Sequence, residues 1–136
     1  MKVLVDTSIW SIALRRSGRA SHTDAASELA SLVADGRVAI IGAIRQELLS
    51  GVRESAHFER LRDHLRAFAD TQVTTEDHEE AATFYNRCRA KGIQGSNTDY
   101  LVCAIAARYD FPIFTADEDF VRFAKVLPIS LHTGDG

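Results

Sequence analysis

The chain has 136 residues, a net charge of −3, 46% hydrophobic residues and 26% charged residues, which is ordinary for a globular protein. No apolar run approaches the roughly 18 residues that cross a bilayer, and "MKVLV" leads directly into Asp6 rather than through a signal-peptide core. We therefore expect a single domain over residues 1–136, located in the cytoplasm and without a membrane partner.

The basic residues are mostly arginine. Of 16 basic residues, only Lys2, Lys91 and Lys125 are lysine. Arginine forms bidentate contacts with phosphate and with carboxylate. The bias therefore leaves both RNA and an acidic protein open as partners.

Strands and helices alternate in the first half of the chain. "KVLV" at 2–5 predicts a strand ending at Asp6, and "DTSIWSIALRR" predicts a helix that begins with capping residues. A second helix is predicted from about Thr23 to Gly36. "RVAIIG" at 37–42 is continuously apolar, as in a buried parallel strand. Helices are predicted next over 43–51 and 54–69.

The alternation continues in the second half. "TQVTT" at 71–75 predicts a brief strand, and residues 76–91 predict a helix with an acidic start and a basic end. An apolar helix over 98–109, the strand "PIF", a short helix "DFVRFA" and a last strand "VLPIS" complete the chain. This order predicts an α/β fold, a three-layer α/β/α sandwich with a mainly parallel central sheet of four to five strands.

Four acidic residues are expected at one edge of that sheet. Asp6 ends the first predicted strand, and Asp117 follows the strand "PIF" by two residues. Glu47 lies in the helix after the second strand, and Asp99 enters an almost wholly apolar helix. Because functional groups gather beyond the carboxyl ends of parallel strands, these four side chains are expected to converge.

Each acid taken alone also has an ordinary explanation. Asp6 before Thr7 and Ser8 fits a helix N-cap, and Glu47 fits a solvated helix residue. Asp99 fits a first-turn acid, and the "DED" run at 117–119 fits a solvated turn. Only their shared position in the predicted topology favours a site.

Four carboxylates in one pocket repel one another unless a cation joins them. Mg²⁺ or Mn²⁺ prefers oxygen ligands, and either ion can activate water and neutralise a phosphoryl oxygen. Thr7 and Thr115 supply hydroxyl groups that would orient carboxylates or water. Asp119 is either an outer ligand or a helix cap.

These residues lie in motifs that resemble a known family. "VLVDTSIW", "IRQELLSG", "TDYLVCAIAARYDFPIFTADEDF" and "VLPI" are similar to the motifs of the PIN domain, and in particular of VapC-type toxins. The resemblance covers nearly the whole chain and keeps the family's order of motifs. It implies a flavodoxin-like fold and a metal-dependent ribonuclease.

The resemblance also implies roles for individual residues. Asp6, Glu47, Asp99 and Asp117 would form the acidic site that binds Mg²⁺ or Mn²⁺, supported by Thr7, Thr115 and Asp119. Metal-activated water would hydrolyse an RNA phosphodiester and leave a 5′-phosphate and a 3′-hydroxyl. Asn97 and Thr98 stand where some members carry a further acid, so one or two metals remain open.

Partners follow from the same resemblance. It implies a toxin–antitoxin pair, a homodimer, and a VapB-like antitoxin that blocks the site. RNA reaching an acidic pocket needs positive charge at the rim. The candidate contacts are Arg15, Arg16, Arg19 and Arg45, each of which also fits a solvated helix face.

Three other functions remain open. A PIN-fold RNA-processing nuclease that is not a toxin shares the same site. A phosphotransfer enzyme with a nucleophilic aspartate needs a nearby lysine, and Lys125 precedes a predicted strand. A non-catalytic module would use the acids to capture a basic peptide.

Overall fold

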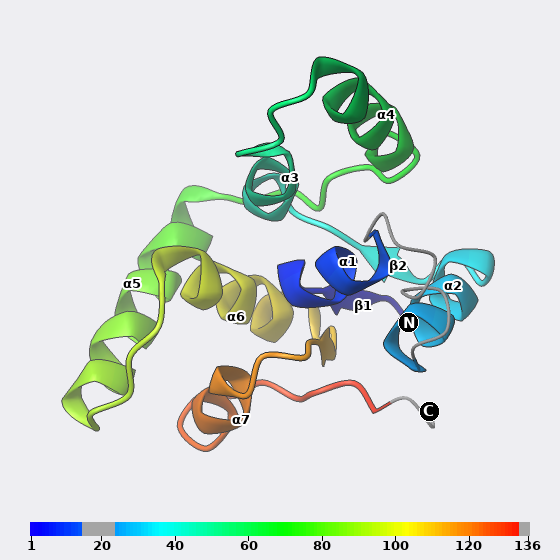
Figure 1. Ribbon diagram of the computed structural model, residues 1–136. Helices are drawn as coiled ribbons and strands as arrows, with labels where there is room; N and C mark the ends of the chain where they lie inside the picture. The colour runs from blue at the N-terminus through cyan, green and yellow to red at the C-terminus, as the bar shows by residue number, and fades with distance from the viewer. Residues whose placement is uncertain (15–23, 134–136) are drawn as a thin grey trace.

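A computed structural model describes residues 1–14 and 24–133 of the chain. Its sheet consists of β1 (Val3–Val5), β2 (Val38–Ala39) and β3 (Ile113–Phe114). The strands are parallel in the order β2-β1-β3, so the first strand of the chain is central (Figure 1). The first strand and "PIF" are therefore neighbours, and β1 lies at the switch point, with one later strand on each side.

The predicted count of four to five strands is wrong for the described residues, which contain three. Single parallel bridges stand where further strands were expected, between Ile40 and Asp70 and between Ile113 and Leu131. Residues 125–128 instead form turns and bends after the preceding helix, where the Val126 and Leu127 amides donate to the Phe123 carbonyl. Pro128 also has no amide hydrogen to donate to a sheet.

The seven helices of the described residues follow the predicted pattern with ends shifted by a few residues. The helix α5 begins one residue before its predicted start, because the Thr74 side chain caps it by accepting from the Asp77 amide. The helix bounds are α1 Thr7–Ala13, α2 Asp24–Ala34, α3 Gly42–Leu49, α4 Ser55–Leu65, α5 Thr75–Ala90, α6 Asn97–Tyr109 and α7 Asp119–Ala124.

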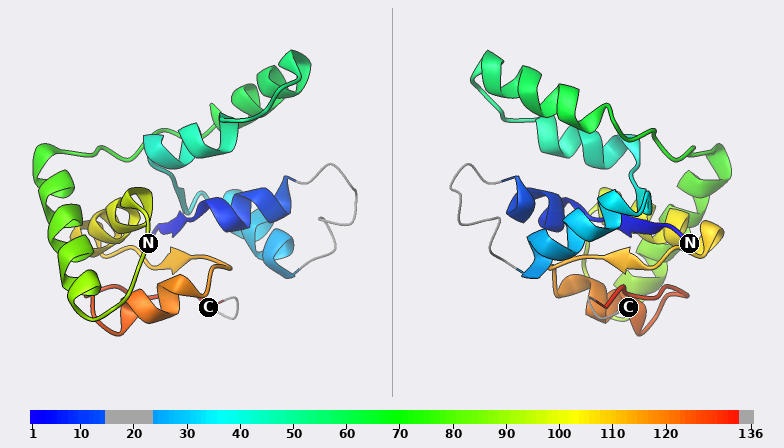
Figure 2. Two further views of the ribbon diagram at one scale, coloured as in Figure 1. Left: turned by 60° about the vertical axis from the view of Figure 1, so that its left-hand side comes forward. Right: turned by 90° about the vertical axis from the view of Figure 1, so that its right-hand side faces the viewer.

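The helices surround the short sheet. Figure 1 shows α5 and α6 side by side at one side of the molecule, with α2 at the opposite side. The pair α3 and α4 lies above the sheet in Figure 1 and in both views of Figure 2. Across the described part of the chain, no helix has the length and apolar character that crossing a membrane requires.

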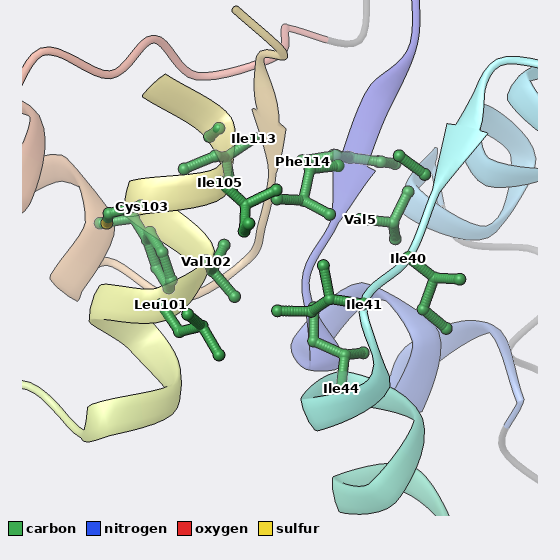
Figure 3. Packing of buried hydrophobic residues seen from close by; sticks show 14 of the residues in the cluster. Val5, Ile40, Ile41, Ile44, Leu101, Val102, Cys103, Ile105, Ile113 and Phe114 are labelled. Atoms are coloured by element: carbon green, nitrogen blue, oxygen red, sulfur yellow. The ribbon is translucent and has the colours of Figure 1, made fainter. Parts of the chain in front are cut away.

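The core forms between α6 and the sheet. Val102 and Ile105 of α6 face Phe114 of β3 and Val5 of β1 (Figure 3), and all four side chains are buried. This explains why the α6 sequence is apolar on nearly every face: residues 100–106 are all buried. The same packing brings the N-terminal turn of α6 toward the carboxyl end of the sheet.

Candidate active site

Asp6 follows β1 directly and is the N-cap of α1. Its Oδ2 accepts hydrogen bonds from the Ser8 hydroxyl at 2.8 Å and the Thr115 hydroxyl at 2.9 Å. The side chain is only 7% exposed. The two hydroxyls hold a buried carboxylate in one orientation at the carboxyl end of the central strand.

The end of β3 is tied to the same point. The Ser8 hydroxyl accepts from the Ala116 amide at 2.9 Å, and the Thr115 hydroxyl accepts from the Asp117 amide at 3.0 Å. Asp117 in turn accepts from the Asp119 amide through Oδ1 at 2.9 Å. This network fixes the turn of residues 115–119 beside Asp6.

Asp99 lies in the first turn of α6 and forms a capping box with Ser96. Its Oδ2 accepts from the Ser96 amide at 2.9 Å, and the Ser96 hydroxyl accepts from the Asp99 amide at 3.1 Å. Burial raises the pKa of Asp99, and the negative charges of Asp6 and Asp117 raise it further, against the lowering effect of the Ser96 hydrogen bonds. Asp99 is therefore within electrostatic reach of both acids at the sheet edge.

Glu47 lies on α3 and is exposed. Its Oε1 accepts a hydrogen bond from the Thr7 hydroxyl at 2.7 Å, although the two residues are 40 positions apart. Thr7 directly follows Asp6, so this bond attaches the fourth acid to the same end of β1. Thr7 and Glu47 line a pocket of about 540 Å³, which Thr98 of α6 completes on another side.

One carboxylate oxygen of each of the four acids accepts a hydrogen bond within the protein. In the described part of the chain, no hydrogen bond to the other oxygen is present: Oδ1 of Asp6, Oε2 of Glu47, Oδ1 of Asp99 and Oδ2 of Asp117. The site thus presents oriented carboxylate oxygens, which are the donors that hard divalent cations prefer.

In the described part of the chain, these acids do not by themselves enclose an ion. Within residues 1–14 and 24–133, no three acidic, histidine or cysteine side chains lie close enough together to hold one metal ion. Mg²⁺ keeps several waters and is commonly held by only one or two protein carboxylates. The residues present therefore fit a hydrated Mg²⁺ or Mn²⁺.

The other predicted site residues have different positions. Asp119 supports Asp117 through its amide, while its carboxylate pairs with Arg122. The Arg45 side chain is partly buried, and its guanidinium contacts Asp70 at 2.9 Å and the carbonyl groups of Leu65 and Phe68. That gives Arg45 an internal structural role. Arg15, Arg16 and Arg19 lie outside the described residues.

Two hydroxyl residues of the site, Ser8 and Ser96, were not predicted as site residues. Ser8 bridges Asp6, Thr115 and the Ala116 amide, and Ser96 holds Asp99. The spacing Ser-x-x-Asp at 96–99 is a capping-box signal that could have identified Ser96. Ser8 carries no comparable signal, because two of its three partners, Thr115 and Ala116, are more than 100 positions away.

Comparison with known proteins identifies the family. The sequence profile of the PIN domain matches residues 3–126, so the chain belongs to the PIN domain family. The predicted resemblance is thereby confirmed. No match was found among curated proteins.

Two solved structures are similar over nearly their full length. One is the crystal structure of VapBC2 from Rickettsia felis bound to a DNA fragment from their promoter, with a TM-score of 0.76 and 18% identity. That match covers 97% of this chain and 98% of the other. The second is FitAcB from Neisseria gonorrhoeae, with a TM-score of 0.75, 17% identity and 97% coverage of both chains. At these identities the likeness establishes the fold.

Proposed function

We propose that the protein is a metal-dependent endoribonuclease that acts as the toxin of a VapBC-type toxin–antitoxin pair. Membership of the PIN domain family supports nuclease chemistry, and the sequence motifs are those of VapC-type toxins. The full-length likeness to the VapBC2 and FitAcB structures supports the toxin assignment over other members of the family.

One observation carries the nuclease proposal. Asp99 is half-buried within electrostatic reach of Asp6 and Asp117, and burial together with those two charges raises the cost of a negative charge on Asp99. A fold that needed only stability would replace such repelling acids with neutral residues. A phosphodiester is also negative, so this site requires a cation before RNA can approach. When bound, Mg²⁺ or Mn²⁺ supplies the charge that activates water and neutralises a phosphoryl oxygen.

The protein's own residues orient the reaction. Asp6, held by Ser8 and Thr115, is the fixed ligand at the end of β1. Asp99 and Asp117 complete the acidic surface beside it, and Glu47, held by Thr7, faces the adjoining pocket. A water positioned by these carboxylates attacks the scissile phosphorus, and the products are a 5′-phosphate and a 3′-hydroxyl.

The proposal includes protein partners. A VapB-like antitoxin would block the site by placing a basic side chain among the acids, where the charges are complementary. The toxin itself is proposed to form a homodimer. Coexpression with a cognate antitoxin should restore growth that the toxin alone arrests. A PIN nuclease that processes RNA without being a toxin would cut RNA but would not arrest growth.

The direct test is RNA cleavage by the purified protein. With Mg²⁺ or Mn²⁺ and structured RNA, the parent protein should cut, whereas Asp6→Asn and Asp99→Asn should not, because each removes a charged ligand. Asp35→Asn, which changes an exposed acid at the end of α2, is the matched control. Cleavage that survives both site substitutions would refute the mechanism. A covalent phosphate trapped on Asp6 would instead support phosphotransfer.

Thr7 allows a finer test of the site. Thr7→Val removes the hydroxyl that holds Glu47 while keeping the side-chain shape. Loss of such a supporting partner commonly lowers metal affinity or activity about 10- to 100-fold. Thr7→Ser keeps the donor and should retain most activity. Equal activity in the Val and Ser variants would show that the bond to Glu47 has no part in the reaction.

A further inference from the structure

Two further pockets continue from the acidic site along α5 and α6. Thr98 lines both the pocket beside Glu47 and a second pocket of about 380 Å³. Tyr85 lines that second pocket and a third of about 360 Å³. We call the second and third pockets together the α5–α6 groove. Through Thr98 it adjoins the acidic site.

The groove follows from the spacing of residues on α5. His78, Ala82, Tyr85 and Arg89 recur every three or four positions, so they share one face of the helix. The short side chain of Ala82, with Ala81 beside it, leaves room between His78 and Tyr85. At 1.5 Å per residue, this face is about 16 Å long, which is enough for more than one nucleotide.

The groove has an aromatic ring at its centre. Tyr85 is half-buried, and its ring contacts the buried Tyr100 ring edge-to-face at 5.4 Å. This contact limits the motion of the Tyr85 ring. A ring held in place between two pockets is suited to stacking against a nucleobase.

Polar groups of the right kind flank the ring. The exposed amides of Asn86 and Asn97 line the second pocket and can pair with the edge of a base. Arg89 lines the third pocket, and its guanidinium forms no hydrogen bond or ion pair with the described residues. It is therefore available to a phosphate.

Charge also changes along this path. Glu47 lines the pocket beside the acidic site, no Asp or Glu among the described residues lines the groove, and Arg89 lies at its far end. A polyanion is thus repelled least in the groove. A basic peptide, as proposed for the antitoxin, gains nothing from Arg89.

We propose that the α5–α6 groove binds single-stranded RNA next to the scissile phosphate, with a base stacked on Tyr85 and a phosphate on Arg89. The inference rests on the proposed function in taking RNA as the substrate. Duplex RNA does not fit this chemistry, because its bases already stack on one another and leave no face for Tyr85.

Binding of labelled single-stranded RNA tests the groove separately from cleavage. In an Asp99→Asn background, which keeps RNA intact, Tyr85→Ala should weaken binding about tenfold, the size expected for one lost stacked base. Tyr85→Phe should bind like the background, because the ring remains. Ala82→Phe, which fills the second pocket from an exposed position, should weaken binding as well.

Arg89 has its own signature. Arg89→Gln should weaken binding at low salt and reduce the slope of log affinity against log salt by about 0.7, as for one phosphate contact on a single strand. Lys91→Gln removes an exposed charge two residues further on and is the matched control; it should leave the slope unchanged. An equal loss in both variants would indicate general charge attraction and would overturn the site.

Crosslinking avoids substitutions altogether. RNA carrying 5-bromouridine, irradiated on the Asp99→Asn protein, should attach to Tyr85 or its groove neighbours. Crosslinks found only elsewhere would overturn the proposal. It would also be overturned if Tyr85→Ala and Arg89→Gln bound RNA normally but bound an antitoxin peptide more weakly. If the parent protein cuts RNA and these variants bind normally, the nuclease stands and the groove fails. If these variants bind RNA poorly but the parent protein cuts no RNA, the groove is supported and the nuclease proposal is wrong.

Discussion

Asp6 serves the fold and the site with different oxygens. As the N-cap of α1, its Oδ2 accepts a hydrogen bond from the Ser8 amide at 3.4 Å. The same oxygen accepts hydrogen bonds from the Ser8 and Thr115 hydroxyls. Its Oδ1 is left for a ligand in the described part of the chain. The two explanations of this residue from the sequence, a helix cap and a metal ligand, are therefore compatible rather than exclusive.

Asp99 shows the same division and predicts a pH effect. Its pKa is raised above the ordinary value of 3.8. Between pH 3.8 and the pKa of Asp99 in the folded state, the folded protein therefore binds more protons than the unfolded chain. The contribution of Asp99 protonation to the free energy of unfolding is complete below pH 3.8. It is lost as pH rises through the pKa of Asp99 in the folded state. Stability of the metal-free protein should therefore fall across this window. Asp99→Asn should remove that fall while keeping an acceptor for the Ser96 amide.

Urea unfolding in EDTA at several pH values between about 4 and 7 measures this effect. The difference in unfolding free energy between Asp99→Asn and the parent should grow in favour of the variant as pH rises. Asp35→Asn serves as the control and should run parallel to the parent. Parallel curves for Asp99→Asn as well would contradict the repulsion inferred among the acids.

At the scale of elements, α5 and α6 carry both the groove and one side of the acidic site, so their contact must be firm. Asp77, in the first turn of α5, is 3% exposed and accepts two hydrogen bonds from Arg108 at 2.7 and 2.8 Å. Arg108 lies in the last turn of α6. The pair thus joins the start of one helix to the end of the other.

Removing this pair should cost stability in a pH-dependent way. Burial alone would raise the pKa of Asp77, but hydrogen bonds from Arg108 and Thr74 lower it below 3.8. Its stabilisation is therefore present above pH 3.8 and is lost as pH falls through the folded pKa. Asp77→Asn should lower the unfolding free energy at pH 7 by about 2 kcal/mol, the range for a hydrogen bond to a charged group.

The comparison of denaturant curves at pH 7 and at pH 3 checks this. The deficit of Asp77→Asn should shrink at the lower pH, because the stabilisation by the Asp77 charge declines as pH falls below 3.8. Glu80→Gln, an exposed acid on the same helix, is the matched control and should show no deficit. A deficit of the same size at both pH values would mean that packing, rather than charge, holds the two helices together.

At the scale of the whole molecule, the sequence predicted most of the fold. The apolar runs at 3–5, 38–39 and 113–114 mark the three strands, because a parallel sheet is buried on both faces. Hydrophobic spacing and capping residues located the helices to within a few positions. The additional predicted strands did not form. Ile40 pairs with Asp70, and Ile113 with Leu131, only through single bridges, which the local sequence does not distinguish from full strands.

The site was less completely predictable. Asp6 and Asp117 follow predicted strands, and Glu47 and Asp99 lie on helices predicted to face the same edge, so the four acids could be named. Their coordination of a metal remains a proposal. The hydroxyls that hold them join residues far apart in the chain, such as Ser8 with Thr115. Arg45 is a different case, because its hydrogen bonds to Asp70 and to two carbonyls could not be predicted from the local sequence.

The last prediction concerns the stability of the molecule as a whole. If the acids repel one another and a cation joins them, binding must stabilise the fold by mass action. At a free metal concentration 100 times Kd, the gain is about 2.7 kcal/mol. For a domain of this size that corresponds to a rise in Tm of about 10 °C.

Thermal unfolding of EDTA-treated protein with added Mg²⁺ or Mn²⁺ measures this shift, and the same titration of Asp6→Asn should give a much smaller one. NaCl at matched ionic strength is the necessary control, because salt also screens repulsion among exposed charges. A rise in Tm that NaCl reproduces, or one that Asp6→Asn retains in full, would show that the acids of this sheet edge do not bind the ion, and the nuclease proposal would fall with them.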